Sequence, residues 1–271
     1  MPTTEYLATQ WGALDQAAEP RAFIHYLDTV GALEPIQRIR RQTYDLLQVR
    51  EGSHILDVGC GLGDDVQALG QRVGVTGRVV GIDCSETMVA EARNRIAELS
   101  LAVELHVGDA RHLRFAANTF DGCRAVRVFM HLSCPEQALA EIVRVARPGA
   151  CIVVFDIDWE TLAVDAPDRS IARKLLNFHG SGSRWIGRQL RRLFLEAGLT
   201  DIGVFAETLM FTDYAQADLV FQLQETAAQA QAAGIVSSAQ ANQWLNDLQQ
   251  AHQTRSFFAA ATGFCVSGRK P

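Results

Sequence analysis

Apolar residues recur along this chain with two different spacings, which predicts strands and helices that follow one another. Short apolar runs have the length of buried strands, and between them apolar residues recur every three or four positions, as on one face of a helix. The unbroken apolar run at 150–155 suits a central parallel strand. Strands are predicted at residues 54–57, 77–83, 103–107, 120–126, 150–155 and 199–211. This succession is typical of an α/β fold with a doubly wound sheet.

Segments outside this alternation predict how the chain is divided. Residues 1–48 are expected to form an N-terminal helical cap over a ligand, and residues 49–271 the main domain. Within that domain we expect a lid-like segment at 157–186, irregular over most of its length, and a helical insertion at 213–258 before the last strand. A capping box from Ser237 to Gln240 begins one helix of the insertion. Three roles remain open for the insertion: a roof over the pocket, a homodimer contact or simple packing.

The stretch most informative about function is a glycine-rich turn between the first strand and the next helix. Asp57 lies at the strand end, and Gly59, Gly61 and Gly63 follow at intervals of two residues. Glycine allows sharp backbone turns close to a ligand, and the following helix begins with free N–H groups and the positive end of its dipole. We therefore expect a nucleoside with a polar or anionic group here. Asp57 either pairs with a cation of the ligand or braces the turn.

Two acidic residues distinguish this turn from a dinucleotide-binding fingerprint. Asp64 occupies the position where the pattern G-x-G-x-x-G has its third glycine, and Asp65 follows it. Both carboxylates would repel a pyrophosphate at the helix N-terminus, although they favour the helix itself. A nicotinamide-dependent oxidoreductase is therefore the less favoured interpretation of the same sheet.

Acidic residues also follow the second and third predicted strands. Asp83 comes twenty residues after Gly63, where a doubly wound sheet presents a carboxylate to the ribose hydroxyls. Its alternative role is to cap the next helix, for which Ser85 is better placed. Met88 either lies against an adenine or fills the core. Asp109 follows the third strand, where its carboxylate would accept the adenine amino group.

Composition narrows the class of protein. The chain has 271 residues, 48% of them apolar, and a net charge of −6 with acids and bases interleaved. It is long enough for a sizeable core, and nothing resembles a basic stripe for nucleic acid. The first residues lack the features of a signal peptide, and no apolar run approaches the ~20 residues that span a bilayer. We therefore expect a cytoplasmic protein that acts on a small molecule. Its six scattered cysteines suggest buried thiols and no metal site.

Taken together, these motifs resemble those of the class I S-adenosylmethionine-dependent methyltransferases. The resemblance extends to the branch that includes ubiquinone/menaquinone-biosynthesis C-methyltransferases and many natural-product methyltransferases. It implies a Rossmann-like sheet of seven strands, mostly parallel, with one antiparallel strand near the C-terminus. The matching segments are LDVGCGLG at 56–63, VVGIDCSETM at 79–88, VELHVGDARHL at 103–113, FDGCRAVRVFMHL at 120–132, EIVRVARPGACIVVFD at 141–156 and the closing FFAAATGFCVSGRKP at 257–271.

This resemblance implies S-adenosyl-L-methionine as the cofactor and assigns roles along its length. The glycine turn would hold the methionine part, Asp83 the ribose, and the residues after the second and third strands the adenine. Val126 departs from the family, where a small polar residue is common, so a side-chain contact to the cofactor's ammonium group is not expected there. The implied cofactor-binding residues are Asp57, Gly59, Gly61, Gly63, Asp83, Cys84, Met88, Asp109, Ala110, Val126 and Arg127.

Methyl transfer from a sulfonium is an in-line displacement, for which alignment of the reacting atoms can supply ~7–11 kcal/mol. His131 is the candidate general base, because it follows the fourth strand and histidine ordinarily titrates near neutral pH. Alternatively it caps the turn before Pro135. Tyr26, Asp158 and Trp159 are candidate substrate contacts, and plain packing is the alternative for the N-terminal aromatic residues. Weaker candidates are Tyr6, Trp11, His25, His179 and Trp185.

The acceptor class is narrowed by motifs that the chain lacks. After the fourth strand there is no N/D-P-P-Y/F, the signature of amino-group methylation on adenine or glutamine, and no acid pair like that of metal-dependent catechol methyltransferases. A small and fairly apolar metabolite is therefore expected, with oxygen, carbon and nitrogen all open as the acceptor atom. A protein that binds S-adenosylmethionine without catalysis is the alternative.

Overall fold

A single mixed sheet organises the chain, and the predicted fold class is confirmed. The computed structural model describes residues 11–16, 20–178 and 183–271. Its seven strands lie in the order β3-β2-β1-β4-β5-β7-β6, and only β7 runs antiparallel to its neighbours. The strands are β1 (His54–Val58), β2 (Arg78–Asp83), β3 (Val103–Val107), β4 (Phe120–Val126), β5 (Ala146–Val164), β6 (Thr200–Phe211) and β7 (Ala259–Arg269).

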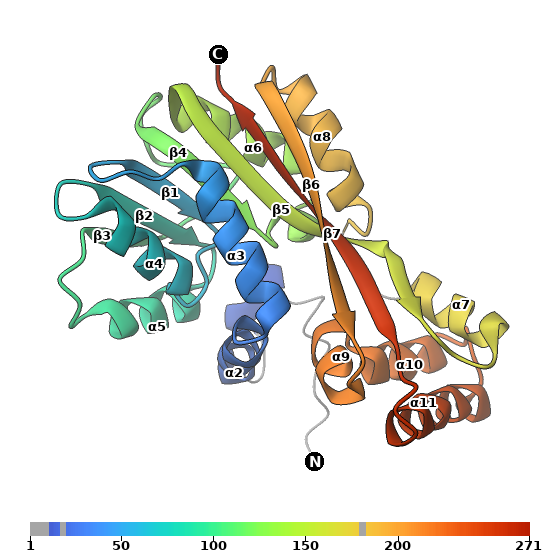
Figure 1. Cartoon of the computed structure of the whole chain (residues 1–271). Helices are drawn as coiled ribbons and strands as arrows, with labels where there is room; N and C mark the ends of the chain where they lie inside the picture. Colours follow the sequence, from blue (N-terminus) through green and yellow to red (C-terminus); the bar gives the residue numbers. More distant parts are fainter. Residues whose placement is uncertain (1–10, 17–19, 179–182) are drawn as a thin grey trace.

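Helices cover both faces of this sheet, as Figure 1 shows. Helices α3, α4 and α5 pack on one face and bury one hydrophobic cluster, whereas α6 and α8 pack on the other face with a second cluster. The helices are η1 (Trp11–Gln16), α2 (Pro20–Gly31), α3 (Glu34–Leu47), α4 (Asp64–Val73), α5 (Glu86–Ile96), η2 (Phe129–His131), α6 (Pro135–Val145), α7 (Arg169–Phe178), α8 (Ile186–Glu196), α9 (Tyr214–Phe221), α10 (Leu223–Ala232) and α11 (Ser238–Gln253).

Strand β5 is much longer than its apolar run suggested. It continues to Val164, where it pairs with Ala259 of β7 beyond a register shift, and α7 follows it. The prediction that the segment at 157–186 is irregular over most of its length is therefore wrong, because β5 extends to Val164 and α7 spans Arg169–Phe178. The error has a physical cause: Glu160 and Ala163 are exposed in this part of the strand, so it lacks the continuous apolar character of a buried strand.

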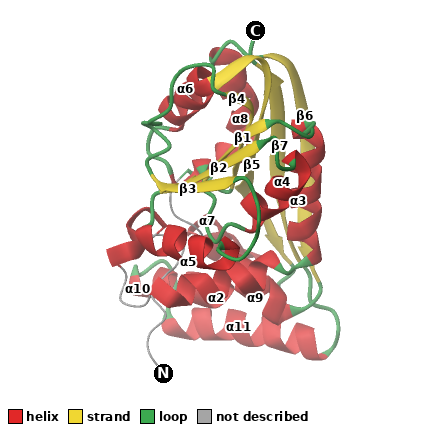
Figure 2. Ribbon diagram, turned by 90° about the vertical axis from the view of Figure 1, so that its left-hand side faces the viewer, coloured by secondary structure: helices red, strands yellow, loops and turns green. Residues whose placement is uncertain are grey.

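The segment at 213–258 is helical, as predicted, and the capping box of Ser237 and Gln240 is present. Helix α10 packs on α7, α9 and α11, at the far end of the long strands β5, β6 and β7 (Figure 1). Trp244 and Leu248 are buried in this group. Helix α9 also contacts α2, so the N-terminal and C-terminal helices gather at the same end of the molecule (Figure 2). Among the described residues, no helix is long and apolar enough to cross a bilayer.

Candidate active site

A cavity of about 540 Å³ opens at the carboxyl ends of β1, β2 and β4, the edge where open α/β sheets bind ligands. Its volume lies within the range of small-molecule sites. The N-terminal helices close one side of it with Leu27, Ile36 and Ile39. No described residue of the 213–258 insertion lines it. Of the predicted site residues, the lining includes Gly59, Gly61, Asp83, Cys84, Met88, Asp109, Ala110, Val126, Arg127 and His131.

The glycine turn has the strained backbone that its sequence predicts. Gly59 and Gly61 have φ angles of 74° and 51°, in the left-handed region. The Gly59 N–H donates to the Ile82 carbonyl at 2.7 Å, which ties the turn to β2. A Cβ at Gly59 would lie 2.2 Å from Cγ2 of Val128, so the position admits glycine alone without movement. Gly63 is outside the cavity lining; it precedes α4 and allows the close approach of Ala92 on α5.

Asp83 lies at the end of β2, between the glycine turn and α5. Its carboxylate accepts hydrogen bonds from the N–H groups of Gly61 at 2.9 Å and Ser85 at 3.0 Å. Burial raises the pKa of Asp83, which these two donors partly oppose. Ser85 caps α5, as predicted, by accepting from the Met88 N–H. Asp83 is therefore free of the capping role and faces the cavity.

Asp15 is a residue of this region that sequence reasoning missed. From η1 it accepts hydrogen bonds from Ser85 Oγ at 2.6 Å and from the Glu86 N–H at 2.7 Å. It thus attaches the N-terminal segment to the start of α5, next to Asp83. No local pattern identifies Asp15, because its partners are about seventy residues away.

The end of the cavity near β3 contains the residues expected around an adenine. Burial raises the pKa of the Cys84 thiol to about 11, so the thiol is un-ionised at neutral pH. Met88 is almost fully buried with Leu62 and also lines the cavity, so both of its predicted roles are compatible with its position. The Asp109 carboxylate accepts from the Arg111 guanidinium at 2.7 Å, an ion pair that sequence analysis did not predict.

Beyond β4, the chain places Arg127 and His131 on the cavity. Arg127 has a φ angle of 59°, rare outside glycine, and its N–H donates to the Phe155 carbonyl at 2.8 Å. His131 ends η2, whose backbone is held by the buried carboxylate of Asp156 through the Phe129 N–H at 3.0 Å. Burial, together with the nearby Arg127 charge, lowers the pKa of His131 to about 4. The near-neutral pKa that histidine ordinarily has, which made His131 the candidate general base, is therefore not retained in this environment.

The lowered pKa of His131 predicts how the stability of the protein depends on pH. The unfolded chain binds a proton at its ordinary pKa of 6.5, whereas the folded protein binds it only near 4. The free energy of unfolding should therefore fall as pH is lowered from 6.5 to 4. Urea denaturation at several pH values should show a shallower fall for His131→Gln than for the wild type. Equal slopes would mean that His131 titrates normally in the folded protein.

The three predicted substrate contacts are not among the residues that line the cavity. The Tyr26 hydroxyl accepts from Arg127 Nη2 at 3.1 Å, so it supports a cavity residue instead. Asp158 is fully buried and accepts from Arg188 Nη2 at 2.7 Å, because α8 brings that arginine over the strand. Trp159 packs edge-on against Phe221. Asp158 and Trp159 lie on β5 and Tyr26 on α2, and a substrate contact by any of the three stays a prediction.

The weaker candidates also lie apart from the cavity lining. His25 is exposed on α2, and Trp185 is exposed beside the Arg188 guanidinium. Tyr6, His179 and the side chain of Trp11 lie outside the described residues. In the described part of the chain, no group of three or more His, Cys, Asp or Glu residues could hold a metal ion.

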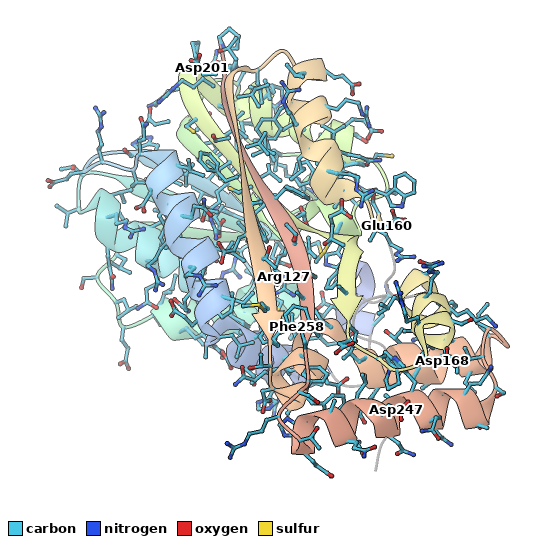
Figure 3. All side chains as sticks on the ribbon, turned by 45° about the vertical axis from the view of Figure 1, so that its right-hand side comes forward. Arg127, Glu160, Asp168, Asp201, Asp247 and Phe258 are labelled. Atoms are coloured by element: carbon cyan, nitrogen blue, oxygen red, sulfur yellow. The ribbon has the colours of Figure 1, made fainter. Side chains whose placement is uncertain are left out.

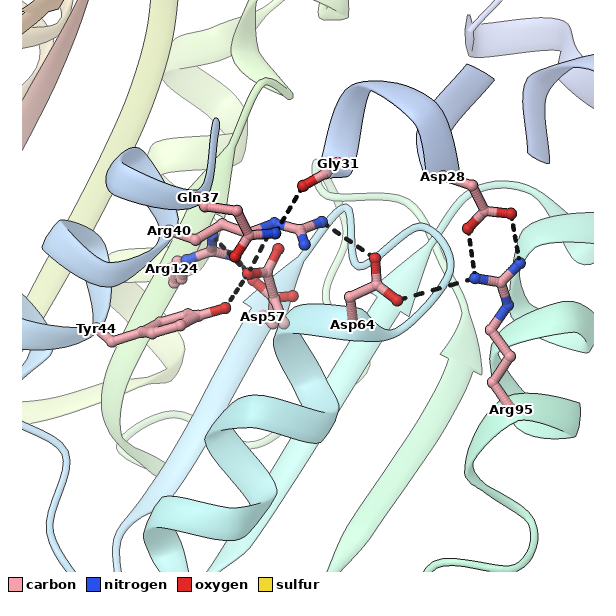
Figure 4. Close-up of polar contacts among 10 residues, drawn as sticks. Asp28, Gly31, Gln37, Arg40, Tyr44, Asp57, Asp64, Arg95 and Arg124 are labelled. Atoms are coloured by element: carbon pink, nitrogen blue, oxygen red, sulfur yellow. Dashed lines mark hydrogen bonds and ion pairs between the residues drawn. The ribbon is translucent and has the colours of Figure 1, made fainter. Parts of the chain in front are cut away.

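Asp57 lies near the end of β1, just before the glycine turn, in a buried ionic network (Figure 4). It lies opposite Arg124 in the pairing of β1 with β4, and its carboxylate contacts that guanidinium at 2.8 Å. Arg124 also contacts Asp65 of α4 at 3.2 Å and donates to Thr43 Oγ1 of α3 at 2.9 Å. The Tyr44 hydroxyl donates to Asp65. Asp57 is absent from the cavity lining and pairs with Arg124, so its position favours the bracing role over contact with a ligand cation.

The network extends from Asp65 towards the cavity entrance. Arg40 of α3 contacts Asp64 at 3.2 Å and Asp65 at 3.5 Å, and Arg95 of α5 contacts Asp28 of α2 at 2.6 Å (Figure 4). Burial raises the pKa of Asp65, but the charges of Arg124 and Arg40 outweigh it and leave a net lowering. Both acids after the glycine turn therefore hold the N-terminal helices against the main domain.

Comparisons with known proteins agree with this geometry. A family model described as "Methyltransferase domain" matches residues 55–149. An uncharacterized 37.1 kDa protein in transposon TN4556 of Streptomyces fradiae is 37% identical over 246 residues, which cover 90% of this chain and 70% of that protein. The demethylmenaquinone methyltransferase of Bacillus cereus is 37% identical over 130 residues, which cover 45% of this chain and 52% of that enzyme. The match thus spans about half the length of that enzyme.

A solved structure shares this fold. The phosphoethanolamine N-methyltransferase 2 of Haemonchus contortus, in complex with S-adenosyl-L-methionine, gives a TM-score of 0.59 at 17% identity and covers 100% of this chain and 61% of its own. The chain belongs to the class I S-adenosylmethionine-dependent methyltransferases. The resemblance found in its sequence motifs is therefore confirmed.

The cavity of this methyltransferase fits its cofactor, S-adenosylmethionine. At Gly59 and Gly61 the backbone approaches the cavity without a Cβ, as contact with the methionine part requires. Asp83 presents a buried carboxylate to the cavity, a group of the kind that accepts hydrogen bonds from ribose hydroxyls. The Nε atom of Arg127 is a buried donor with no acceptor among the described residues. A nucleoside that carries a carboxylate has hydroxyl groups to donate to Asp83 and oxygen atoms to accept from Arg127.

Proposed function

We propose that this methyltransferase transfers the methyl group of S-adenosylmethionine to a small, largely apolar metabolite by in-line displacement at oxygen, carbon or nitrogen. The proposal rests on the apolar side chains in the part of the cavity lining that lies away from Asp83. This part of the lining includes Leu27, Ile36 and Ile39 of the N-terminal helices and Val126 and Val128 at the end of β4. Burial of an apolar acceptor against such side chains is favourable by roughly 25 cal/mol per Å² of apolar surface.

The N-terminal helices support this proposal because they exclude water from the reacting groups. Ion pairs join α2 to α5 through Asp28 and Arg95, and α3 to α4 through Arg40 and Asp64. When bound, the cofactor supplies an activated methyl group, so the protein's main task is to align the acceptor and keep the site dry. The residues at 1–48 are thus proposed to act as a cap. A mobile lid at 157–186 stays a prediction.

His131 is proposed as a contact to the acceptor and not as a strong base. Its imidazole is un-ionised at neutral pH, since its pKa is lowered to about 4 by burial and by Arg127. A neutral imidazole orients an acceptor by a hydrogen bond, but its low basicity limits proton removal. An acceptor that is already nucleophilic at neutral pH suits this site best.

Replacement of Asp83 tests the cofactor half of the proposal. Asp83→Ala is expected to weaken binding of S-adenosylhomocysteine at least tenfold, or about 1.4 kcal/mol, because a charge-assisted hydrogen bond to the ribose is lost. Titration calorimetry measures this affinity. Glu104→Ala is the matched control, because it removes the same charge from an exposed strand residue that pairs with Arg78. Wild-type affinity in Asp83→Ala would remove Asp83 from the site.

The acceptor is tested by a screen for turnover. Purified protein with labelled S-adenosylmethionine is incubated with small phenols, quinols, amines and carboxylic acids, and transfer of label to any of them supports the proposal. The alternative, a protein that binds the cofactor silently, predicts tight binding of S-adenosylhomocysteine and no labelled product from these classes. Binding of NADH in preference to S-adenosylhomocysteine would instead favour an oxidoreductase.

A further inference from the structure

Basic residues are concentrated in the stretch of chain that forms α7 and α8. Residues 169–195 contain seven arginine and lysine residues and no acid, although the net charge of the chain is −6. The expected interleaving of acids and bases therefore does not extend to this stretch. Its basic residues are Arg169, Arg173, Lys174, Arg184, Arg188, Arg191 and Arg192.

These basic residues lie on one side of the molecule. Helices α7 and α8 are both on the right-hand side in Figures 1 and 3. The Arg184 guanidinium donates to the carbonyl oxygens of Leu176, at 2.8 Å, and of Asn177, so the residues before α8 are tied to the end of α7. Arg173, one turn before Asn177, is exposed, as is Arg191 of α8. We call the seven basic residues, together with Trp185 and Leu195, the α7–α8 surface.

Much of the charge on the α7–α8 surface is not neutralised by acids. Arg188 contacts the buried Asp158 and, at 3.4 Å, Glu160, which Figure 3 labels between α7 and α8. Arg192 contacts Glu196 at 2.8 Å. A surplus of positive charge remains and suits an anionic partner. The basic members that form no ion pair among the described residues are Arg169, Arg173, Lys174, Arg184 and Arg191.

Two large apolar side chains are exposed among these charges. Trp185 is 51% exposed and Leu195 is 50% exposed, at the two ends of α8. Arg188 and Arg192 lie between them at helical spacing, so the four side chains form one exposed stripe. The central carbon of the Arg188 guanidinium lies 5.7 Å from the centre of the Trp185 ring. Positive charge and apolar surface are thus combined on the outward face of α8.

A layer of lipid headgroups fits this combination better than other polyanions do. Arginine and lysine are attracted to anionic headgroups, and tryptophan is enriched where lipid meets water. Nucleic acid also attracts arginine and stacks on aromatic rings, but it gives an exposed leucine such as Leu195 no apolar environment. The charges and the apolar side chains together therefore favour the surface of an anionic bilayer.

We propose that the α7–α8 surface binds membranes that contain anionic lipids, with the lipid phosphates at its arginines and Trp185 at the level of the headgroups. This binding is peripheral and goes beyond the proposed methyl transfer, on which it does not depend. The Ser183 N–H donates to the Met130 carbonyl at 3.0 Å, which joins the start of this surface to η2. Because His131 of η2 lines the cavity, a bound bilayer would lie on the His131 side of the cavity.

Cosedimentation with sucrose-loaded vesicles tests the recognition of charge. Vesicles of phosphatidylcholine with about 30% phosphatidylglycerol are compared with vesicles of pure phosphatidylcholine, and we expect at least tenfold tighter binding to the anionic ones. An increase of NaCl from about 0.1 M to about 0.5 M should weaken that binding at least tenfold, because salt screens exposed charges. Equal binding to both kinds of vesicle, or binding to neither, would overturn the proposal.

Substitution of one arginine on each helix tests the place of binding. Arg173→Gln/Arg191→Gln should bind the anionic vesicles at least tenfold more weakly, because each basic residue near such a membrane contributes about fivefold. The matched control, Arg21→Gln/Arg50→Gln, removes the same charge from exposed residues of α2 and of the loop after α3, and should bind within about twofold of the wild type. Urea denaturation should give both variants the midpoint of the wild type. Wild-type binding by Arg173→Gln/Arg191→Gln would count against the α7–α8 surface.

Tryptophan fluorescence tests whether the exposed stripe meets the lipid. Trp185 is exposed, whereas Trp244 is buried and Trp159 is half-buried, so a blue shift on addition of anionic vesicles should arise mainly from Trp185. Trp185→Phe keeps an apolar ring, so it should bind within about threefold of the wild type and lose most of the shift. A shift of wild-type size in Trp185→Phe would mean that another surface meets the lipid.

A single-stranded oligonucleotide distinguishes nucleic acid from lipid as the partner. If the protein binds the oligonucleotide but not the anionic vesicles, and Arg173→Gln/Arg191→Gln weakens that binding, the proposal is wrong and the surface binds nucleic acid. Vesicle binding that the double variant weakens supports the proposal whether or not the oligonucleotide binds. The salt dependence and the Trp185→Phe shift are measured without the double variant, so they test the proposal even if that variant fails to fold.

Discussion

Arg124→Met is expected to lower the free energy of unfolding by about 3–5 kcal/mol, which is the usual cost when one partner of a buried ion pair is removed. The guanidinium of Arg124 is 2% exposed and contacts both Asp57 and Asp65. Without it, two carboxylates remain buried in the folded protein with less compensation. Urea denaturation of the variant and the wild type measures the difference.

Two further variants separate charge from packing in this network. Arg124→Met/Asp57→Leu removes both members of the pair, and we expect it to recover most of the loss, because apolar replacements of buried pairs are often neutral. Arg192→Met breaks the exposed pair with Glu196 and should change stability by less than about 0.5 kcal/mol. A double variant that is no more stable than Arg124→Met would show that the side chain's volume matters more than its charge.

The loss of stability caused by Arg124→Met should depend on pH in one direction. Burial raises the pKa of Asp57 to about 6 in the wild type. The wild type therefore loses stability as pH rises towards 6, and slightly above pH 6 this loss is complete. Loss of Arg124 should raise that pKa further, because the nearest positive charge is gone. The variant then continues to lose stability above pH 6 while the wild type does not. The deficit should therefore be larger at pH 8 than at pH 6.

The fold could be predicted from the sequence because the relevant signals are local. The glycine turn, the Ser85 cap and the Ser237–Gln240 capping box each depend on residues within a few positions of one another. The alternation of strands and helices then leaves few topologies. By contrast, the end of β5 is defined by its pairing with β7, whose partner residues lie about a hundred positions away. Such pairing leaves no local pattern in the sequence.

The sequence predicts which backbone segments border the cavity better than it predicts which side chains face it. Positions next to strand ends face the cavity by topology alone, as Gly59, Asp83 and Arg127 do. The direction of Asp158 depends on Arg188 of α8, which no spacing rule connects to it. Arg124 did leave a signal, because an arginine within an apolar strand requires a buried acid. Asp57, its neighbour in the strand pairing, was the available partner.

Gly59→Ala is expected to weaken binding of S-adenosylhomocysteine by at least tenfold and to lower the free energy of unfolding by roughly 2–5 kcal/mol. The added Cβ would meet Val128 Cγ2 at 2.2 Å, and overpacking costs about 1–3 kcal/mol. The left-handed backbone at φ 74° adds about 1–2 kcal/mol for any residue with a side chain. Relief of the clash would move either the turn or Val128, and both border the cavity.

A second glycine separates these two contributions. Gly149→Ala places a Cβ on a backbone with φ 80° but with no atom within 4 Å, so it should cost only the strain and leave binding unchanged. Gly59→Ala/Val128→Ala removes most of the clash and should recover part of both stability and affinity. If Gly59→Ala binds S-adenosylhomocysteine as the wild type does, the turn does not hold the cofactor's methionine part. If the double variant recovers nothing, the left-handed strain at Gly59 outweighs its contact with Val128.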